Sequence, residues 1–145
     1  MKIKTWLKYF IYVFIIIVFM YLLGYISVYL KKLQEAFSIS IYQYGLITFI
    51  LYALIGFLIG LEHFLKEKRK NGRWRVNLSK LTLMGLPSLY FSFYVFIFYC
   101  PVPFIRAALI QPIEFFLRVN MNLITIFQLL FGYVVITSFY KVSEK

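Results

Sequence analysis

Long apolar stretches without charge alternate with short charged segments along the chain. Because an α-helix rises about 1.5 Å per residue, roughly 20 apolar residues are needed to cross ~30 Å of hydrocarbon. The pattern therefore predicts an all-α membrane protein, with a single integral membrane domain over residues 1–145. We expect four transmembrane helices packed in a compact bundle, at residues 9–30, 40–61, 81–100 and 119–140.

The connection at residues 101–118 has an amphipathic pattern, because apolar and charged side chains fall on different faces of a helix. A helix of this kind lies in the plane of the membrane interface. We therefore expect a short outer interfacial helix, bent at Pro112. Its apolar face holds Ile105, Leu109, Ile113, Phe116 and Leu117, and its charged face holds Arg106, Glu114 and Arg118.

Basic residues are distributed unevenly between the two sides of the expected bundle. Three lie in the N-terminal tail, seven in the loop at residues 62–80, and two, Lys141 and Lys145, in the C-terminal tail. These make twelve on one side, whereas the other two connections carry four. Positively charged loops stay in the cytoplasm. The sequence thus predicts a multi-pass protein of the cell membrane with both termini and the basic loop inside.

The composition indicates that lipid, not water, is the natural solvent of this chain. Hydrophobic residues make up 63% and charged residues 14%, whereas a soluble domain has about 45–50% apolar residues. The net charge is +11, but the basic residues sit between apolar stretches and no nucleic-acid motif accompanies them. We therefore expect no nucleic-acid partner. The expected partner of this charge is the anionic headgroups of the cytoplasmic leaflet.

Each expected helix carries a row of small or polar residues at helical spacing, which predicts that the rows line the bundle interior. The GxxxG at Gly56 and Gly60 predicts a packing face within the chain, with a dimer interface as the alternative. The rows are Tyr21, Tyr25 and Tyr29; Gly45, Thr48, Tyr52, Gly56 and Gly60; Gly85, Ser88, Ser92 and Tyr99; and Asn122, Thr125, Gln128 and Gly132.

Gln128 is the most polar side chain near the middle of the fourth expected helix. An amide without a partner in hydrocarbon costs several kcal/mol. We therefore expect Gln128 to face the interior and to bond to Ser92, Tyr52 or a backbone carbonyl. With Thr125, these residues form a candidate polar interior. The simpler interpretation is that Gln128 links two helices through a hydrogen bond. The alternative is that it lies along the path of a transported substrate.

Few side chains are available for catalysis or metal binding. The chain has one His and one Cys and no Asp, and it contains no GxSxG, HExxH or Walker-type motif. Glu62 and His63 form a candidate pair at the inner end of the second helix, although polar residues there also mark the membrane boundary. We predict no enzyme activity, no metal site and no cofactor.

The chain lacks catalytic groups but has two interfacial surfaces, the basic loop at residues 62–80 and the amphipathic segment at residues 101–118. This combination favours a non-enzymatic scaffold or accessory subunit of a membrane complex. A small transporter or channel-like protein that works as an oligomer is the alternative, with the candidate polar interior as its lining. The partner is then another membrane protein or a second copy. The charge of the basic loop is also explained by topology alone. Candidate headgroup or partner contacts are Lys66, Lys68, Arg69, Lys70, Arg73, Trp74 and Arg75.

Overall fold

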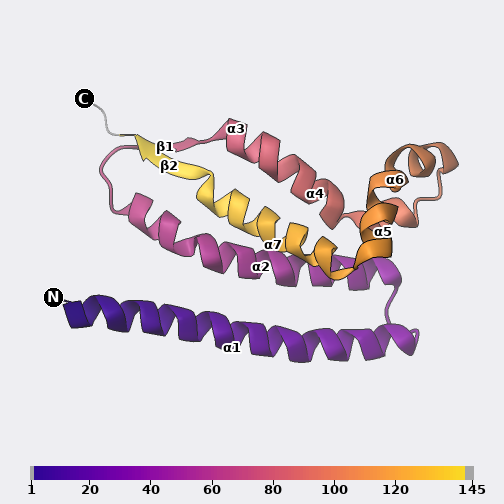
Figure 1. The fold of residues 1–145 in the computed structure, drawn as a ribbon, viewed down its shortest axis with the longest axis horizontal. Helices are drawn as coiled ribbons and strands as arrows, with labels where there is room; N and C mark the ends of the chain where they lie inside the picture. The colour runs from indigo at the N-terminus through magenta and orange to yellow at the C-terminus, as the bar shows by residue number, and fades with distance from the viewer. Residues whose placement is uncertain (1, 143–145) are drawn as a thin grey trace.

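The computed structural model describes residues 2–142, with side chains from residue 6 onward. Lys145, which entered the charge balance above, lies outside the described residues. The described chain is mostly helical, as the hydrophobic pattern predicts. The start of α1 and the end of β2 lie at the same end of an elongated molecule, where the connection between α2 and β1 also lies (Figure 1). We refer to this as the basic end, and to the opposite one as the far end.

Helices α1 (Lys2–Glu35) and α2 (Ile41–Lys68) form a long antiparallel pair. Both are long and apolar enough to cross a membrane, so they are candidate spans in the places predicted at residues 9–30 and 40–61. Ser40 caps α2: its hydroxyl accepts from the Gln43 backbone N–H at 3.2 Å, and the Gln43 side chain accepts from the Ser40 backbone N–H at 3.0 Å. This reciprocal pair satisfies donors that a helix start leaves open, so it determines where α2 begins.

The third expected span, residues 81–100, is interrupted. After strand β1 (Arg73–Val76) the chain forms α3 (Leu78–Lys80), a π-helical turn η1 (Leu81–Gly85), α4 (Leu86–Ser92) and α5 (Tyr94–Phe98). Proline lacks a backbone N–H, so Pro87 removes a helical hydrogen bond just after the widened turn. The Ser88 hydroxyl donates to the carbonyls of Met84 at 2.8 Å and Gly85 at 2.9 Å. The chain therefore accommodates Pro87 through the π-helical turn that precedes it.

The amphipathic segment predicted at residues 101–118 is confirmed as a helix, α6 (Pro103–Val119). It turns by 116° into α7 (Asn122–Thr137) at a short break around Asn120. The helical part of the fourth expected span, residues 119–140, is therefore shorter than predicted. Within the described residues, α1 and α2 are each long enough to span a membrane, and α6 with α7 adds a third span only if the bent pair counts as one.

The C-terminal segment pairs with the basic loop, which the sequence did not predict. Strand β2 (Phe139–Val142) runs antiparallel to β1, with Arg73 opposite Val142 and Val76 opposite Phe139. A bend at Gly72 precedes β1, and Gly72 has a φ of 140°, which favours glycine. Residues 139 and 140 therefore belong to a strand at the basic end and do not continue the fourth helix.

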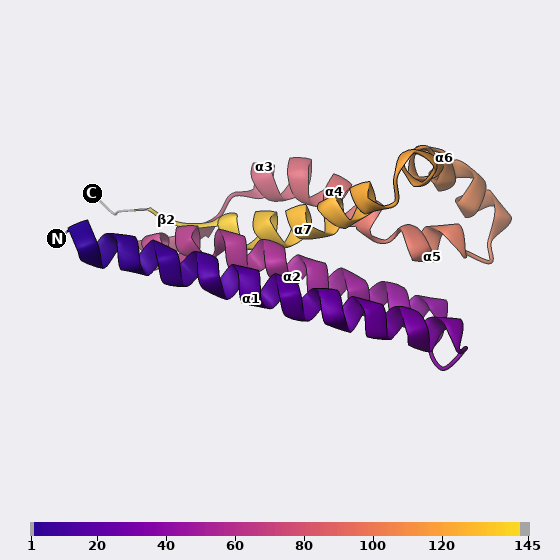
Figure 2. The ribbon, with the colours of Figure 1, turned by 60° about the horizontal axis from the view of Figure 1, so that its bottom comes forward.

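The helices lie in the order α1, α2, α7 and α4 across the molecule (Figures 1 and 2). The closest packing is between α2 and α7, which run in the same direction. A Cβ added to Gly56 would lie 1.8 Å from the Leu129 carbonyl oxygen, and one added to Gly132 would lie 1.8 Å from the Ala53 carbonyl oxygen. Only glycine permits this approach. The GxxxG at Gly56 and Gly60 thus packs within the chain.

The tyrosine row of α1 does not line the interior, contrary to the expectation from its spacing. Tyr21, Tyr25 and Tyr29 are 80%, 76% and 58% exposed. The opposite face of α1 lies against α2, where Leu23 and Leu30 are buried and the Tyr12 hydroxyl donates to the Ile59 carbonyl at 2.8 Å. Helical spacing identifies a shared face, but it does not determine which neighbour that face meets.

Candidate functional site

A cavity of about 520 Å³ lies among α1, α2, α5 and α7, toward the far end of the molecule. Polar rows from α2 and α7 meet there. Each row repeats every three or four residues, so its side chains project from a single helix face. The α2 row holds Tyr44, Thr48 and Tyr52, and the α7 row holds Asn122, Thr125 and Gln128.

The structure brings together three of the four residues predicted to form a polar interior. Tyr52, Thr125 and Gln128 line the cavity. Ser92 is buried, but its hydroxyl donates to the Ser88 carbonyl at 2.6 Å within its own helical segment. Ser92 is therefore a local structural residue and not part of this cavity.

Gln128 is buried in the wall of the cavity, with 3% of its surface exposed. Its side chain forms no hydrogen bond within the described part of the chain, so the bonds expected with Ser92, Tyr52 or a carbonyl are not made. A buried amide without a partner is costly. The cavity therefore presents a primary amide that is available to a bound molecule.

The third wall of the cavity comes from α1, whose lining residues were not among the predicted site residues. Ser27, Lys31 and Gln34 line the cavity from this helix. Their spacing of four and three residues places them on one helix face, and this spacing is the signal that could have revealed them. The Ser27 hydroxyl oxygen is buried and has no hydrogen-bond partner in the described structure. Among the described residues that line the cavity, Lys31 alone is charged.

Aromatic residues around α5 close the remaining side of the cavity. Tyr94, Phe98 and Tyr99 contribute to this wall, and the Tyr42 hydroxyl of α2 holds it by donating to the Tyr99 carbonyl at 2.9 Å. The helix break at Phe93 sets α5 apart from α4 and next to α2. The lining thus combines hydroxyl and amide groups with aromatic surface, an arrangement that suits a polar group on an apolar body.

The structure does not join Glu62 and His63 into one site. Glu62 forms an ion pair with Lys66 at 2.9 Å, as the spacing of four residues predicts, and His63 is exposed on the surface of α2. Within the described residues, no three His, Cys, Asp or Glu side chains lie close enough to hold a metal ion.

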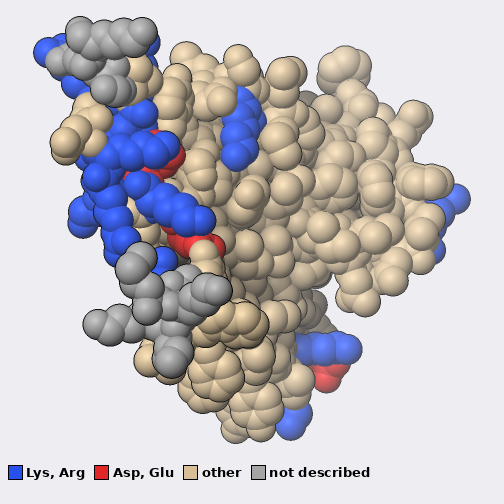
Figure 3. Space-filling model, turned by 60° about the vertical axis from the view of Figure 1, so that its left-hand side comes forward, with Lys and Arg blue, Asp and Glu red and all other residues tan. Residues whose placement is uncertain are grey.

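Lysine and arginine side chains gather at the basic end (Figure 3). All seven residues predicted to contact headgroups or a partner are exposed there. One exposed member, Lys70, forms an ion pair with the carboxylate of Glu67, a buried residue that the sequence analysis did not select. The seven are Lys66, Lys68, Arg69, Lys70, Arg73, Trp74 and Arg75.

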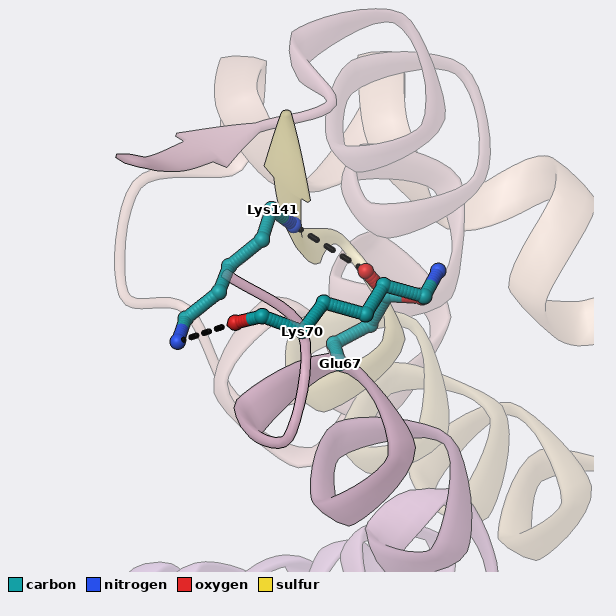
Figure 4. A network of polar contacts seen from close by, with 3 residues as sticks. All are labelled: Glu67, Lys70 and Lys141. Carbon is teal, nitrogen blue, oxygen red and sulfur yellow. Dashed lines mark hydrogen bonds and ion pairs between the residues drawn. The ribbon is translucent and has the colours of Figure 1, made fainter. Parts of the chain in front are cut away.

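Glu67 also connects α2 to the C-terminal strand (Figure 4). Its carboxylate accepts from the Lys141 backbone N–H at 3.0 Å. The Lys141 ammonium in turn donates to the carbonyls of Lys68 at 3.0 Å and Lys70 at 2.8 Å. These contacts join segments more than 70 residues apart in the sequence, so the end of α2 and strand β2 form one surface.

Lys141 and Lys80 also lie over aromatic rings at this end. The Lys141 ammonium lies 5.2 Å from the ring centre of Trp74, which stacks on Phe64 at 5.2 Å. The Lys80 ammonium donates to the Thr137 hydroxyl at 2.7 Å and lies 5.4 Å from the ring centre of Tyr133. Both lysines therefore help to hold β2 and α7 in place.

No protein-family model matches this chain, and neither the curated proteins nor the solved structures contain a match.

Proposed function

We propose that the chain crosses the membrane four times, with the basic end in the cytoplasm. The turn η1 and helix α4 run beside α7 (Figure 1). At about 1.5 Å per residue the helical residues from Leu78 to Ser92 cover ~22 Å, and α5, beyond the break at Phe93, completes the ~30 Å of the hydrocarbon core. In this arrangement α7 is the fourth crossing and α6 lies across the outer interface. The excess of basic residues at one end supports the orientation.

Within this topology the protein acts as a non-enzymatic accessory subunit of a membrane complex. The observation that carries this proposal is the exposed tyrosine row of α1. Tyr21, Tyr25 and Tyr29 lie on the side of α1 away from α2, and their hydroxyls have no hydrogen-bond partner in the described structure. Hydrocarbon offers no partner either.

Position along α1 separates Tyr21 from an ordinary interfacial tyrosine. Tyr21 is 13 residues from Lys8 and 10 residues from Lys31, which corresponds to about 20 Å and 15 Å along the helix. Its ring is therefore near the membrane centre, whereas tyrosines normally lie at the headgroup level. A neighbouring helix with polar groups at this depth satisfies the hydroxyls, since hydrogen bonds between helices stabilise association in lipid.

Co-purification from mild detergent tests the accessory role. The variant with Tyr21→Phe, Tyr25→Phe and Tyr29→Phe keeps the rings but removes the hydroxyls. At about 0.6 kcal/mol for each bond, we expect the partner to bind roughly twentyfold more weakly. Tyr140→Phe, at the basic end, is the matched control and should retain the partner.

Three results contradict the accessory role: a parent protein that purifies alone, a complex that contains only this chain, or a triple variant that holds its partner as tightly as the parent does. Circular dichroism of each variant establishes that the helices are intact.

The cavity supports a second candidate function, a small transporter that works as an oligomer. Tyr52, Thr125 and Gln128 present polar groups to the cavity between the helices. Under this proposal Gln128→Leu abolishes the uptake of a polar solute into liposomes and leaves the helical content unchanged. Phosphate, glycerol and glucose form a suitable panel. Uptake that survives the substitution, or a parent that moves none of the three, excludes this function.

A further inference from the structure

We propose that the cavity among α1, α2, α5 and α7 binds a phosphate group carried by an amphiphile, with Lys31 as its counter-ion. The cavity of about 520 Å³ lies within the range of roughly 300–1,000 Å³ that is typical of small-molecule sites. This inference does not depend on the accessory role, which concerns the opposite face of α1. The proposed phosphate site concerns binding at equilibrium, so the proposal holds whether or not the ligand is transported.

The charge of the cavity indicates an anion. Lys31 lines it, and none of the described lining residues is Asp or Glu. Glu35 lies one turn after Lys31, but the two form no ion pair in the described structure. An ammonium group at the edge of a low-dielectric cavity that is not paired with a carboxylate attracts an anionic ligand.

The number of available donors favours phosphate over a smaller anion. The Gln128 amide is buried in the wall and lacks a partner, and the Ser27 hydroxyl oxygen is buried and also lacks one. Gln34 and Asn122 add two further amides. A phosphate has several strong acceptor oxygens, so it can accept from the Lys31 ammonium and from more than one of these groups at the same time.

The apolar part of the lining indicates that the phosphate belongs to an amphiphile. Ile41, Phe98 and Leu117 share the cavity wall with the polar groups. A phosphate ester with an apolar body places its charge at Lys31 and its body against these side chains. A lipid headgroup and a soluble phosphate ester have the same anionic chemistry, and the experiment distinguishes them.

Binding to the purified full chain in a neutral detergent tests the proposal. Native mass spectrometry measures retention of dioleoyl phosphatidylglycerol against dioleoylglycerol, which has the same chains without phosphate. Calorimetry measures sn-glycerol 3-phosphate against glycerol. We expect phosphatidylglycerol to bind once per chain and dioleoylglycerol to bind more weakly. Binding of glycerol 3-phosphate without binding of phosphatidylglycerol would contradict a site for an amphiphile. Binding of the lipid alone identifies a lipid headgroup, and binding of both phosphates shows that the anion suffices.

Lys31→Gln and Lys32→Gln form a matched pair, because both lysines are exposed but only Lys31 lines the cavity. We expect Lys31→Gln to weaken binding about tenfold, as loss of a charge-assisted hydrogen bond does, and Lys32→Gln to change it less than twofold.

Ser27→Ala provides a second variant that alters only the buried hydroxyl. We expect binding to weaken about threefold to tenfold, with the melting temperature of the parent retained. The proposal is overturned if neither phosphate binds, if the phosphate-free analogues bind equally well, or if Lys31→Gln and Lys32→Gln have equal effects.

Discussion

Single glycines set the distance between α2 and α7. Gly56 and Gly132 each face a backbone carbonyl of the other helix, and Gly60 faces the side chain of Ile136, 2.3 Å from where its Cβ would be. In lipid, where no hydrophobic force draws two apolar helices together, such close contact between backbones is a main source of affinity. Gly24, in contrast, has nothing within 4 Å of the same position.

Gly132→Ala should destabilise the fold, because the new Cβ lies 1.8 Å from the Ala53 carbonyl oxygen and the two helices must separate. We expect a loss of about 1–3 kcal/mol in the free energy of unfolding, measured by thermal or denaturant unfolding in detergent. Gly24→Ala is the control and should be neutral or slightly stabilising, since alanine favours a helix more than glycine does. Equal losses in the two variants would contradict the packing described here.

At the scale of the elements, interruptions of the helices decide where functional side chains lie. The break at Phe93 brings α5 beside α2, so that Tyr94 and Phe98 line the cavity. The turn at Asn120 lays α6 at 116° to α7, and buries Ile110 and Ile113. Beyond Thr137, the chain leaves the helix and pairs with the basic loop as β2.

Glu67→Ala should release strand β2 from the end of α2. The substitution removes the acceptor of the Lys141 backbone N–H and the partner of Lys70. A lost hydrogen bond to a charged group costs about 1.5–3 kcal/mol, so amide exchange of residues 139–142 should accelerate roughly tenfold to a hundredfold. Glu62→Ala, which removes only the surface pair with Lys66, should leave exchange in β2 unchanged. Similar exchange in both variants would show that Glu67 does not anchor the strand.

The whole molecule has two chemically different ends. The basic end holds the strands, the network around Glu67 and most of the Lys and Arg side chains (Figures 3 and 4). The far end holds the cavity, α5 and α6. Because α1 lies at the edge of the layered helices and rests on α2, it contributes one wall to the cavity and offers its other face to the surroundings.

The proposed orientation can be tested with single cysteines in a Cys100→Ser background. Asn71→Cys lies in the basic loop and Phe37→Cys lies in the exposed connection between α1 and α2. With the basic end in the cytoplasm, a membrane-impermeant thiol reagent should label position 37 in intact cells and position 71 only after permeabilisation. Labelling of position 71 from outside would overturn the orientation.

The sequence by itself determined those features that depend on local spacing and on the requirements of lipid. The lengths of α1 and α2, the helix at 101–118 and the pair formed by Glu62 and Lys66 all follow from residues close together in the chain. The contact made by the GxxxG of α2 was also predicted, because glycine pairs allow few alternatives to close packing.

Only the tertiary structure decided which faces meet. Helical spacing places Tyr21 and Tyr25 on one face, but that face points away from α2 because the opposite face of α1 packs there. The same packing brings Lys31 and Gln128, nearly 100 residues apart in the sequence, to the walls of one cavity. The pairing of β1 with β2 also depends on residues far apart in the chain, such as Arg73 and Val142. A pattern read along one helix contains no information about its neighbours, so the cavity became visible only once the helices were placed together.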